Sequence, residues 1–352
     1  MSKLEETISL IGALDQDAMA SARARQDTLT KPLGSLGRLE ELSIQMAGIT
    51  GQPQPRIQHK VIITMAGDHG VVAEGVSAYP QEVTPQMVYN FLRGGAGINV
   101  LARHAGARVV VVDMGVACRI DPHPDLIDRK VAMGTRNMAI GPAMSRDEAR
   151  RSVEAGIEIL EAEASRGLDI VGTGDMGIGN TTASSAITAA FTGCSVEVLT
   201  GRGTGLNDEQ LHHKVRVIRR ALEVNRPDPA DPLGVLAGVG GFEIGGLVGV
   251  ILGAAASRIP VVIDGFISGA AALIACGFCP QARDYLIPAH RSVEAGHRAI
   301  FEHLRLKPLL DMDLRLGEGT GAALAIFIAE AAARILSEMA TFGEAGVSEA
   351  LE

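Results

Sequence analysis

The chain has 352 residues, of which 47% are hydrophobic and 21% charged, a composition typical of a globular protein with a large core. Its formal net charge of −9 argues against a nucleic-acid partner, because neutralising phosphates requires a basic face. Trp is absent and aromatic residues make up only 3%, so the core must be built from Ala, Val, Ile and Leu, as in helices packed on a parallel sheet.

The N-terminal residues, MSKLEETISLIGALDQDAMA, scatter acidic side chains among apolar ones. This pattern is typical of an amphipathic helix rather than of a signal peptide. The four cysteines are Cys118, Cys194, Cys276 and Cys279, and we expect reduced thiols in a cytoplasmic protein. Cys276 and Cys279 have the C-x-x-C spacing of zinc ligands, but no second pair of Cys or His residues accompanies them, so no metal is expected.

From residue 56 onward, short apolar runs alternate with longer helix-like segments. The runs lie at 61–66, 109–112, 168–171, 195–199 and 259–263. Because they are rich in β-branched residues, they predict strands buried on both faces. The segment 145–167 is typical of the intervening helices, since it opens on Ser145 with Glu148 three residues later. Strands alternating with helices predict a doubly wound α/β fold with a mostly parallel sheet.

The two ends of the chain look helical instead. We expect residues 1–55 together with 290–352 to form a smaller helical domain beside a large α/β domain at 56–289, with QPQPR at 52–56 as the linker. The most apolar stretch, 246–278, is interrupted by Arg258, Pro260 and Asp264. It predicts a helix, a buried strand and a second helix rather than a membrane span, so no membrane partner is expected.

A glycine-rich turn follows the predicted strand at 168–171. Gly172, Gly174 and Gly177 fit the G-x-G-x-x-G spacing of a dinucleotide-binding turn. A dehydrogenase would place a ribose-binding acid at the end of the next strand, but Glu197 lies inside its run. A Walker loop is also disfavoured, because no G-K-[ST] follows.

The same turn continues into Asn180, Thr181 and Thr182 at the start of a predicted helix. Such residues commonly serve as helix caps. A glycine turn that carries amides and hydroxyls at a helix N-terminus is also an anion-binding site. Both interpretations remain open at this point.

Two further glycine turns carry charged side chains. The turn at 201–205 opens a helix with Lys214, which either reaches a phosphate or is simply solvated. Glu318 lies between Gly317 and Gly319, immediately before an Ala-rich helix. An interaction with the helix dipole explains a glutamate there, whereas the flanking glycines would let a ligand approach its carboxylate. Glu318 is therefore a candidate catalytic base.

Asp68 and His69 follow the first predicted strand and suggest an acid–base pair, although a lone His at a strand end is more often structural. No G-x-S-x-G nucleophile elbow completes a triad, and the nine histidines show no metal-ligand spacing. The residues alone therefore predict an α/β enzyme with a phosphate-bearing ligand and a carboxylate base.

Eight motifs stand in the order of one known family. They are KPLGSLGRLEEL (31–42), AGDHGV (66–71), EGVSAYPQEVT (74–84), GDMGIGNTTAS (174–184), GGFEIGGLVG (240–249), DGFISGAAAL (264–273), LIPAHRSVEAGH (286–297) and LRLGEGTGAALA (314–325). Across nearly its whole length, the chain resembles the nicotinate-nucleotide–dimethylbenzimidazole phosphoribosyltransferases of cobalamin lower-ligand synthesis. The resemblance implies a homodimer that needs no cofactor.

The reaction implied by the resemblance transfers phosphoribose from nicotinate mononucleotide to 5,6-dimethylbenzimidazole, giving α-ribazole 5′-phosphate and nicotinate. The pyridine nitrogen of the mononucleotide is already cationic, so it leaves as a neutral ring and no metal is needed. A base that removes the azole N–H strengthens the attacking nitrogen. In the family that base is the glutamate of the R-L-G-E-G motif, which here is Glu318.

The resemblance also implies three sets of site residues. The family's phosphate-binding elements fall on Gly177, Gly179, Asn180, Thr181, Thr182, Gly203, Lys214 and Ser292. The base pocket is expected around Tyr79, Pro80, Met87 and Leu316. The family often has Glu where this chain has Asp175, which we expect to support catalysis. The alternative of another class is a non-enzymatic nucleotide-binding module that does not use Glu318.

Overall fold

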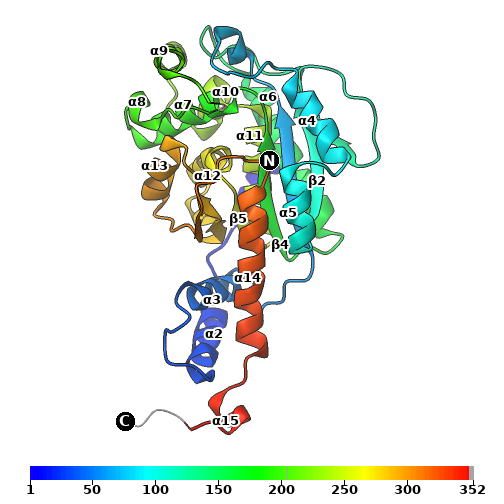
Figure 1. The fold of residues 1–352 in the computed structure, drawn as a ribbon, viewed down its shortest axis with the longest axis vertical. Coiled ribbons are helices and arrows are strands. Elements are labelled where there is room, and N and C mark those ends of the chain that lie inside the picture. Colours follow the sequence, from blue (N-terminus) through cyan, green and yellow to red (C-terminus); the bar gives the residue numbers. More distant parts are fainter. Residues whose placement is uncertain (204, 349–352) are drawn as a thin grey trace.

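The computed structural model describes residues 1–203 and 205–348 and contains one six-stranded parallel sheet (Figure 1). The strands are β1 (Lys60–Gly67), β2 (Arg108–Gly115), β3 (Leu126–Asp128), β4 (Ile170–Met176), β5 (Val261–Ile263) and β6 (Leu286–Pro288). Their order is β3-β2-β1-β4-β5-β6, which confirms the predicted doubly wound α/β fold. In this order the direction of winding reverses between β1 and β4, where such sheets bind ligands.

The sheet is buried on both faces because alternate residues of each strand face opposite cores. On β1, Val61, Ile63 and Met65 belong to one buried cluster, whereas Ile62 and Ala66 belong to the other. The unbroken apolar run predicted this two-sided burial. A strand with one wet face would have alternated with polar residues.

Helices cover both faces. On one face, α6 (Arg146–Ala164) packs against α11 (Phe242–Ala256), which lies on β1, β2 and β4. On the other lie α4 (Val83–Leu92), α5 (Gly97–Ala105) and the long helix α14 (Thr320–Glu338). The predicted N-terminus of α6 is confirmed, since Ser145 and Glu148 form a reciprocal capping box.

The apolar stretch at 246–278 forms α11, β5 and α12 (Phe266–Phe278), as predicted. The strand predicted at 195–199 is wrong, because this segment is a short helix, α8 (Val196–Leu199). Val196 and Leu199 are buried while Val198 is exposed, so the burial follows the three-residue spacing of a helix turn. The next helix along the chain is α9 (Asp208–Asn225). It packs against α7 (Asn180–Thr192) and α10 (Pro232–Val239).

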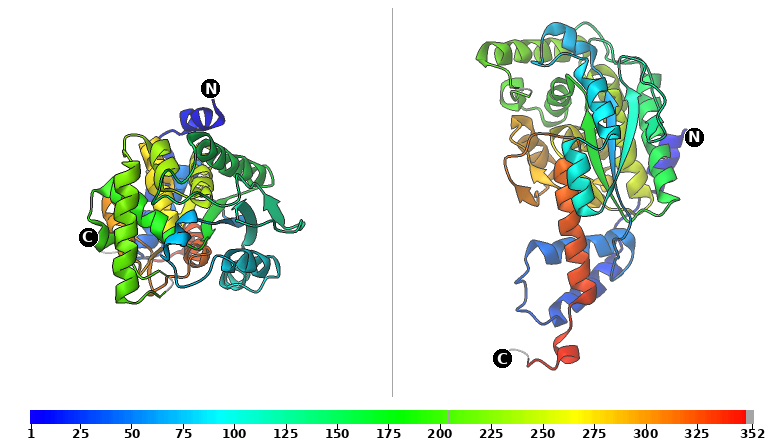
Figure 2. Two further views of the ribbon diagram at one scale, coloured as in Figure 1. Left: turned by 90° about the horizontal axis from the view of Figure 1, so that it is seen from above. Right: turned by 45° about the vertical axis from the view of Figure 1, so that its right-hand side comes forward.

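The terminal segments divide between two places. The helices α2 (Gln16–Thr28) and α3 (Arg38–Thr50) pack with the end of α14, where Ala22, Ala47 and Leu336 form a small buried cluster (Figures 1 and 2). In contrast, α1 (Lys3–Leu10) lies against α6 and α11, and α13 (Ala295–Leu304) lies against α7 and α12. The boundaries of the smaller domain stay a prediction.

The remaining elements are short. They are η1 (Gly70–Glu74), η2 (Pro280–Tyr285), β7 (His290–Arg291), β8 (Leu310–Asp311) and α15 (Phe342–Ala345). By length and composition α14 is apolar enough to cross a membrane, but 56% of its most apolar window is buried inside the protein. Its packing against β4, β5, α3 and α5 makes it a core helix.

Candidate active site

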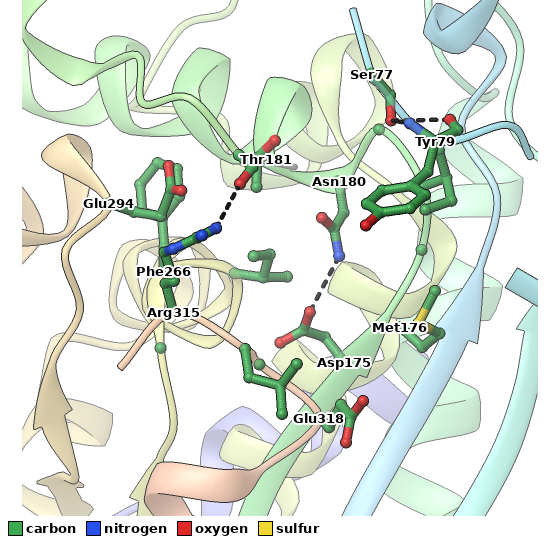
Figure 3. A pocket seen from close by; sticks show the side chains of 18 of the residues that line it. Ser77, Tyr79, Asp175, Met176, Asn180, Thr181, Phe266, Glu294, Arg315 and Glu318 are labelled. Atoms are coloured by element: carbon green, nitrogen blue, oxygen red, sulfur yellow. Dashed lines mark hydrogen bonds between the residues drawn. The ribbon is translucent and has the colours of Figure 1, made fainter. Parts of the chain in front are cut away.

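A cleft of about 520 Å³ opens at the carboxyl end of β4. Its walls come from the turn after β4, the loop leading to α4, the loop after β5, the segment around β7 and the loop before α14 (Figure 3). These segments are far apart in sequence, and they meet because parallel strands end at one edge of the sheet.

Most of the residues predicted from the sequence line this cleft. They are Tyr79, Met87, Asp175, Gly177, Gly179, Asn180, Thr181, Gly203, Ser292, Leu316 and Glu318. Three others stand behind its surface or beside it. Lys214 and Thr182 are buried and do not line the cleft, and Pro80 is exposed next to Tyr79.

Glu318 lies at the floor of the cleft with its side chain directed at the N-terminus of α5. Its Oε2 atom accepts a hydrogen bond from the backbone N–H of Ile98 at 3.1 Å. Burial raises the pKa of the carboxyl above its ordinary value, and the backbone N–H groups of Ile98 and Gly97 oppose this rise. A carboxylate with a raised pKa that faces a cleft is suited to accept a proton.

The backbone of Glu318 has an unusual conformation. Gly317, Glu318 and Gly319 have φ values of +79°, +64° and +98°, so three consecutive residues are left-handed. For a residue with a side chain this conformation costs roughly 1–2 kcal/mol, and the surrounding structure must hold it in place. The two glycines therefore have a backbone role in this turn.

Asp175 is the penultimate residue of β4 and is 5% exposed. Its Oδ2 atom accepts a hydrogen bond from the Asn180 side-chain amide at 3.0 Å (Figure 3), while its Oδ1 atom has no hydrogen-bond partner among the described residues. Burial, together with the charges of Asp264, Glu243 and Glu318, raises the pKa of Asp175 well above its ordinary value. Two acidic side chains with raised pKa values thus line one cleft.

The glycine turn after β4 passes very close to the end of β1. A Cβ atom on Gly177 would lie 2.2 Å from the Gly67 carbonyl oxygen, so no side chain fits there. Gly179 has a φ of +96° and precedes the first residue of α7. The turn thereby brings the N-terminus of α7, with its partial positive charge, to the cleft wall.

Lys214 reaches the same wall from α9. Its Nζ atom donates a hydrogen bond to the Thr181 hydroxyl at 2.7 Å, although the lysine is only 1% exposed. Burial lowers the pKa of Lys214 to about 8, and the Glu294 carboxylate opposes this shift. A Cβ atom on Gly203 would be 3.2 Å from the ammonium nitrogen, so the glycine keeps the approach to the lysine open.

The opposite wall is largely apolar and includes Val76, Val83 and Met87. Tyr79 and Leu316 are 55% and 60% exposed and stand at the cleft, where Figure 3 shows the Tyr79 ring across from Glu318. An aromatic ring bound between these side chains would cover them from water.

Sequence reasoning missed several polar residues of the site. Glu294, His290 and Arg315 line the cleft, and Arg315 donates a hydrogen bond to the Gly203 carbonyl at 3.2 Å. Asp264 lies beneath the cleft and accepts backbone hydrogen bonds from the start of α14. Arg315 and Asp264 both lie inside the quoted motifs, and Asp264 directly follows a strand, the one local signal that could have singled it out.

Asp68 and His69 do not form the acid–base pair that the sequence suggested. The His69 Nε2 atom lies 2.6 Å from the Glu243 carboxylate, and both side chains are fully buried. Burial acts to lower the pKa of His69, but the Glu243 charge, the hydrogen bond to Glu243 and the Asp68 charge together outweigh burial and raise it. Asp68 instead accepts a hydrogen bond from the Ala117 N–H at 2.8 Å.

The described residues contain no group of three or more His, Cys, Asp and Glu side chains placed to hold a metal ion. All four cysteines are free, with Cys118 and Cys194 exposed and Cys279 buried. Burial raises the pKa of Cys276 to about 12, so this thiol is inert at neutral pH.

Known proteins resemble this chain over its whole length. A family model described as phosphoribosyltransferase matches residues 11–347. The nicotinate-nucleotide–dimethylbenzimidazole phosphoribosyltransferase of Roseiflexus sp. (strain RS-1) is 62% identical over 100% of both chains. That of Desulforudis audaxviator (strain MP104C) is 63% identical over 99% of both.

Solved structures agree with these relatives. The crystal structure of nicotinate-nucleotide–dimethylbenzimidazole phosphoribosyltransferase from Thermus thermophilus has a TM-score of 0.91 and 48% identity. It covers 96% of this chain and 100% of its own. A crystal structure of CobT from the same organism has a TM-score of 0.92 and 50% identity, over 95% of this chain and 100% of its own. The chain therefore belongs to this phosphoribosyltransferase family.

Proposed function

We propose that this enzyme transfers the phosphoribosyl group of nicotinate mononucleotide to 5,6-dimethylbenzimidazole or a related base in cobalamin nucleotide-loop synthesis. The products are α-ribazole 5′-phosphate and nicotinate. Full-length relatives at about 60% identity carry this activity in their names, which supports the substrate pair. The observation that carries the proposal is the buried Glu318 carboxylate, which faces the same cleft as the phosphate-site residues.

Glu318 is the proposed general base. It takes the N–H proton of the azole while the other ring nitrogen attacks C1′ of the ribose. The C1′–N bond to nicotinate breaks as the new bond forms on the opposite face, so the β-nucleotide becomes an α-riboside. The bonding electrons neutralise the pyridinium nitrogen, and the leaving group departs without a metal. Besides the base, the enzyme contributes mainly positioning of the two rings.

The 5′-phosphate is proposed to bind at the wall formed by the turn after β4. Gly177, Gly179, Asn180, Thr181 and Thr182 bring the N-terminus of α7 to this wall, and Gly203, Lys214 and Ser292 complete the set. Lys214 places its positive charge beside Thr181, because its Nζ atom donates a hydrogen bond to the Thr181 hydroxyl. Helix N-termini and lysine side chains are common phosphate ligands.

The azole is proposed to bind against Tyr79, Pro80, Met87 and Leu316, with Asp175 supporting catalysis beside it. The exposed ring of Tyr79 and the side chain of Leu316 offer apolar surfaces for a flat bicyclic base. The identity of the preferred base depends on this wall and not on the phosphate-site residues.

We also propose a cytoplasmic homodimer. The four free thiols suit a reducing compartment. Sedimentation or light scattering at micromolar concentration is the measurement for the dimer, and a stable monomer would contradict it.

Incubation with nicotinate mononucleotide and dimethylbenzimidazole tests the activity. Release of nicotinate with formation of the α-riboside is expected, in proportion to enzyme. A non-enzymatic nucleotide-binding module would bind the mononucleotide and release nothing. A dehydrogenase would instead transfer hydride from a reduced nicotinamide cofactor.

A further inference from the structure

The turn that carries Glu318 is joined to the ends of three neighbouring strands. From β1, the Thr64 hydroxyl donates a hydrogen bond to the Glu318 carbonyl at 2.9 Å. From β4, the Asp175 carbonyl accepts one from the Glu318 N–H at 3.2 Å. From the residue after β5, the Asp264 carboxylate accepts the N–H groups of Gly319 at 3.2 Å and of Ala322 at 3.0 Å.

The fit of this turn on the sheet is close. Thr64 and Gly174 are register partners on β1 and β4. A Cβ atom on Gly174 would lie 2.3 Å from the Glu318 carbonyl oxygen, so that carbonyl sits directly over the glycine. The Glu318 carbonyl, which accepts the Thr64 hydroxyl, therefore has no room to move closer to the sheet.

Asp264 is fully buried, and its two carboxylate oxygens accept N–H groups from the first turn of α14. It therefore serves as a helix cap from outside the helix, since the residue at the cap position is Gly319, which has no side chain. Its own backbone is fixed, because the Asp264 N–H donates to the Thr173 hydroxyl at 3.2 Å.

We infer that Thr64 and Asp264 are positioning residues that hold Glu318 in its left-handed conformation and so aim its carboxylate at the azole. Glu318 has no intrinsic preference for this conformation, and without the two contacts its turn would relax toward ordinary backbone angles. Neither residue lines the cleft, so neither touches substrate. The inference rests on the proposed role of Glu318 as the general base.

Two variants test the inference, each in the wild-type chain and in a Glu318→Gln background. Thr64→Val keeps the shape of the side chain and removes the hydroxyl. Asp264→Asn keeps the size but replaces one N–H acceptor with an N–H₂ donor. Each is expected to lower kcat about 10- to 100-fold, the cost of a misplaced catalytic group. The KM values of both substrates should change less than about twofold, because no binding contact is removed.

In the Glu318→Gln background the same substitutions should lower kcat by less than about twofold, because residues that act through one group are not additive. Equal losses in both backgrounds, or losses mainly in KM, would overturn the inference. If Glu318→Gln itself kept wild-type turnover, the assignment of Glu318 as the base would be wrong. The inference, which rests on that assignment, would then be wrong as well. If Asp264→Asn did not fold, Thr64→Val, which changes no charge or volume, would decide the question.

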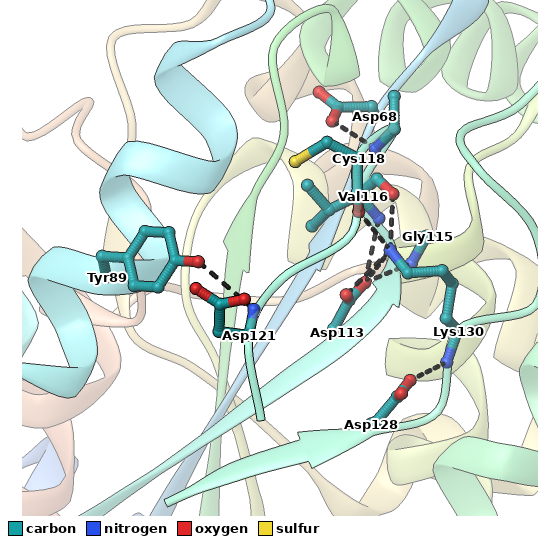
Figure 4. A network of polar contacts seen from close by, with 10 residues as sticks. Asp68, Tyr89, Asp113, Gly115, Val116, Cys118, Asp121, Asp128 and Lys130 are labelled. Carbon is teal, nitrogen blue, oxygen red and sulfur yellow. Dashed lines mark hydrogen bonds and ion pairs between the residues drawn. The ribbon is translucent and has the colours of Figure 1, made fainter. Parts of the chain in front are cut away.

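The chain offers matched controls away from the cleft. Asp113 is also buried at the carboxyl end of a strand, where its Oδ1 atom accepts the N–H groups of Gly115 and Val116 (Figure 4). Thr188 is a buried threonine whose hydroxyl donates to the Ser184 carbonyl. Asp113→Asn and Thr188→Val should leave kcat per folded molecule unchanged in both backgrounds, whatever they do to stability.

Discussion

The Glu318 carboxylate accepts the backbone N–H of Ile98, so the proposed base points at the N-terminus of α5. The N–H groups there favour the ionised carboxylate, but burial outweighs them and raises its pKa above 4.5. The base works only when ionised. Turnover should therefore fall on the acid side, with a midpoint above pH 4.5.

This pH dependence is measured as kcat with both substrates saturating, because protonation of the free nucleotide phosphate then no longer affects binding. The pKa values of Asp175 and Asp264 are also raised, the latter to about 7, chiefly by burial. The charge of Glu318 contributes to both rises, because it disfavours ionisation of these two neighbours. A midpoint at or below pH 4.5 would show that burial does not dominate at Glu318.

Glu318→Gln should lower turnover by roughly 10²- to 10⁴-fold, the usual contribution of a positioned general base. The amide preserves the size of the side chain but cannot accept the azole proton, so the KM values and the unfolding temperature should change little. Steady-state release of nicotinate measures the effect. Glu330→Gln, on the helix α14 that follows Glu318 but paired with Lys60 away from the cleft, is the control and should keep its turnover. Near wild-type turnover in Glu318→Gln would exclude it as the base.

Lys214→Met should weaken nicotinate mononucleotide binding about 10- to 100-fold, which corresponds to one hydrogen bond to a charged group. Affinity for the azole alone should stay within twofold, because the lysine contacts Thr181 and does not line the cleft as Tyr79 and Leu316 do. Calorimetric titration with each ligand separates the two effects. Lys60→Met is the matched control, because Lys60 is the first residue of β1 and does not line the cleft. Equal losses for both ligands would indicate a disturbed fold rather than a phosphate contact.

Much of the fold follows from local sequence. The run at 61–66 predicts a strand buried on both faces because all of its residues except Thr64 are apolar, as is typical of a central parallel strand. The run at 195–199 misleads because five residues are too few to separate a strand from one helical turn. The backbone hydrogen bond from the Thr200 N–H to the Val196 carbonyl and the burial of Val196 and Leu199 reveal the helix.

The site was harder to predict where its contacts join distant segments. Glu318 and the turn at 177–182 were found because glycines and polar residues stand together in sequence. Asp264 was not, because its partners Gly319 and Ala322 lie more than fifty residues away, and no local pattern tells which acid caps which helix. Likewise, the position of Lys214 on a helix was predicted, but its burial behind Thr181 depends on how α9 packs on α7.

The family resemblance implies that Glu is common at the position where this chain has Asp175. Its Oδ2 atom is occupied by the Asn180 amide, but its Oδ1 atom has no partner among the described residues, and the side chain lines the cleft. If Asp175 only shaped the turn, Asn could replace it and activity would survive. A buried carboxylate near three other acids is costly to keep for that purpose alone.

Asp175→Asn should therefore lower turnover about tenfold or more, as expected when a hydrogen bond to a charged group is lost, while the unfolding temperature stays nearly the same. Asp169→Asn is the matched control, because Asp169 precedes the same strand and accepts the backbone N–H groups of Gln58 and His59. In a Glu318→Gln background, Asp175→Asn separates two roles. If Asp175 takes the proton when Glu318 is absent, the double variant should be far slower than Glu318→Gln alone. If Asp175 instead orients the azole or ribose for Glu318, its loss should add little once the base is gone. Full activity in the single Asp175→Asn variant would contradict both roles and leave Asp175 as a turn-forming residue.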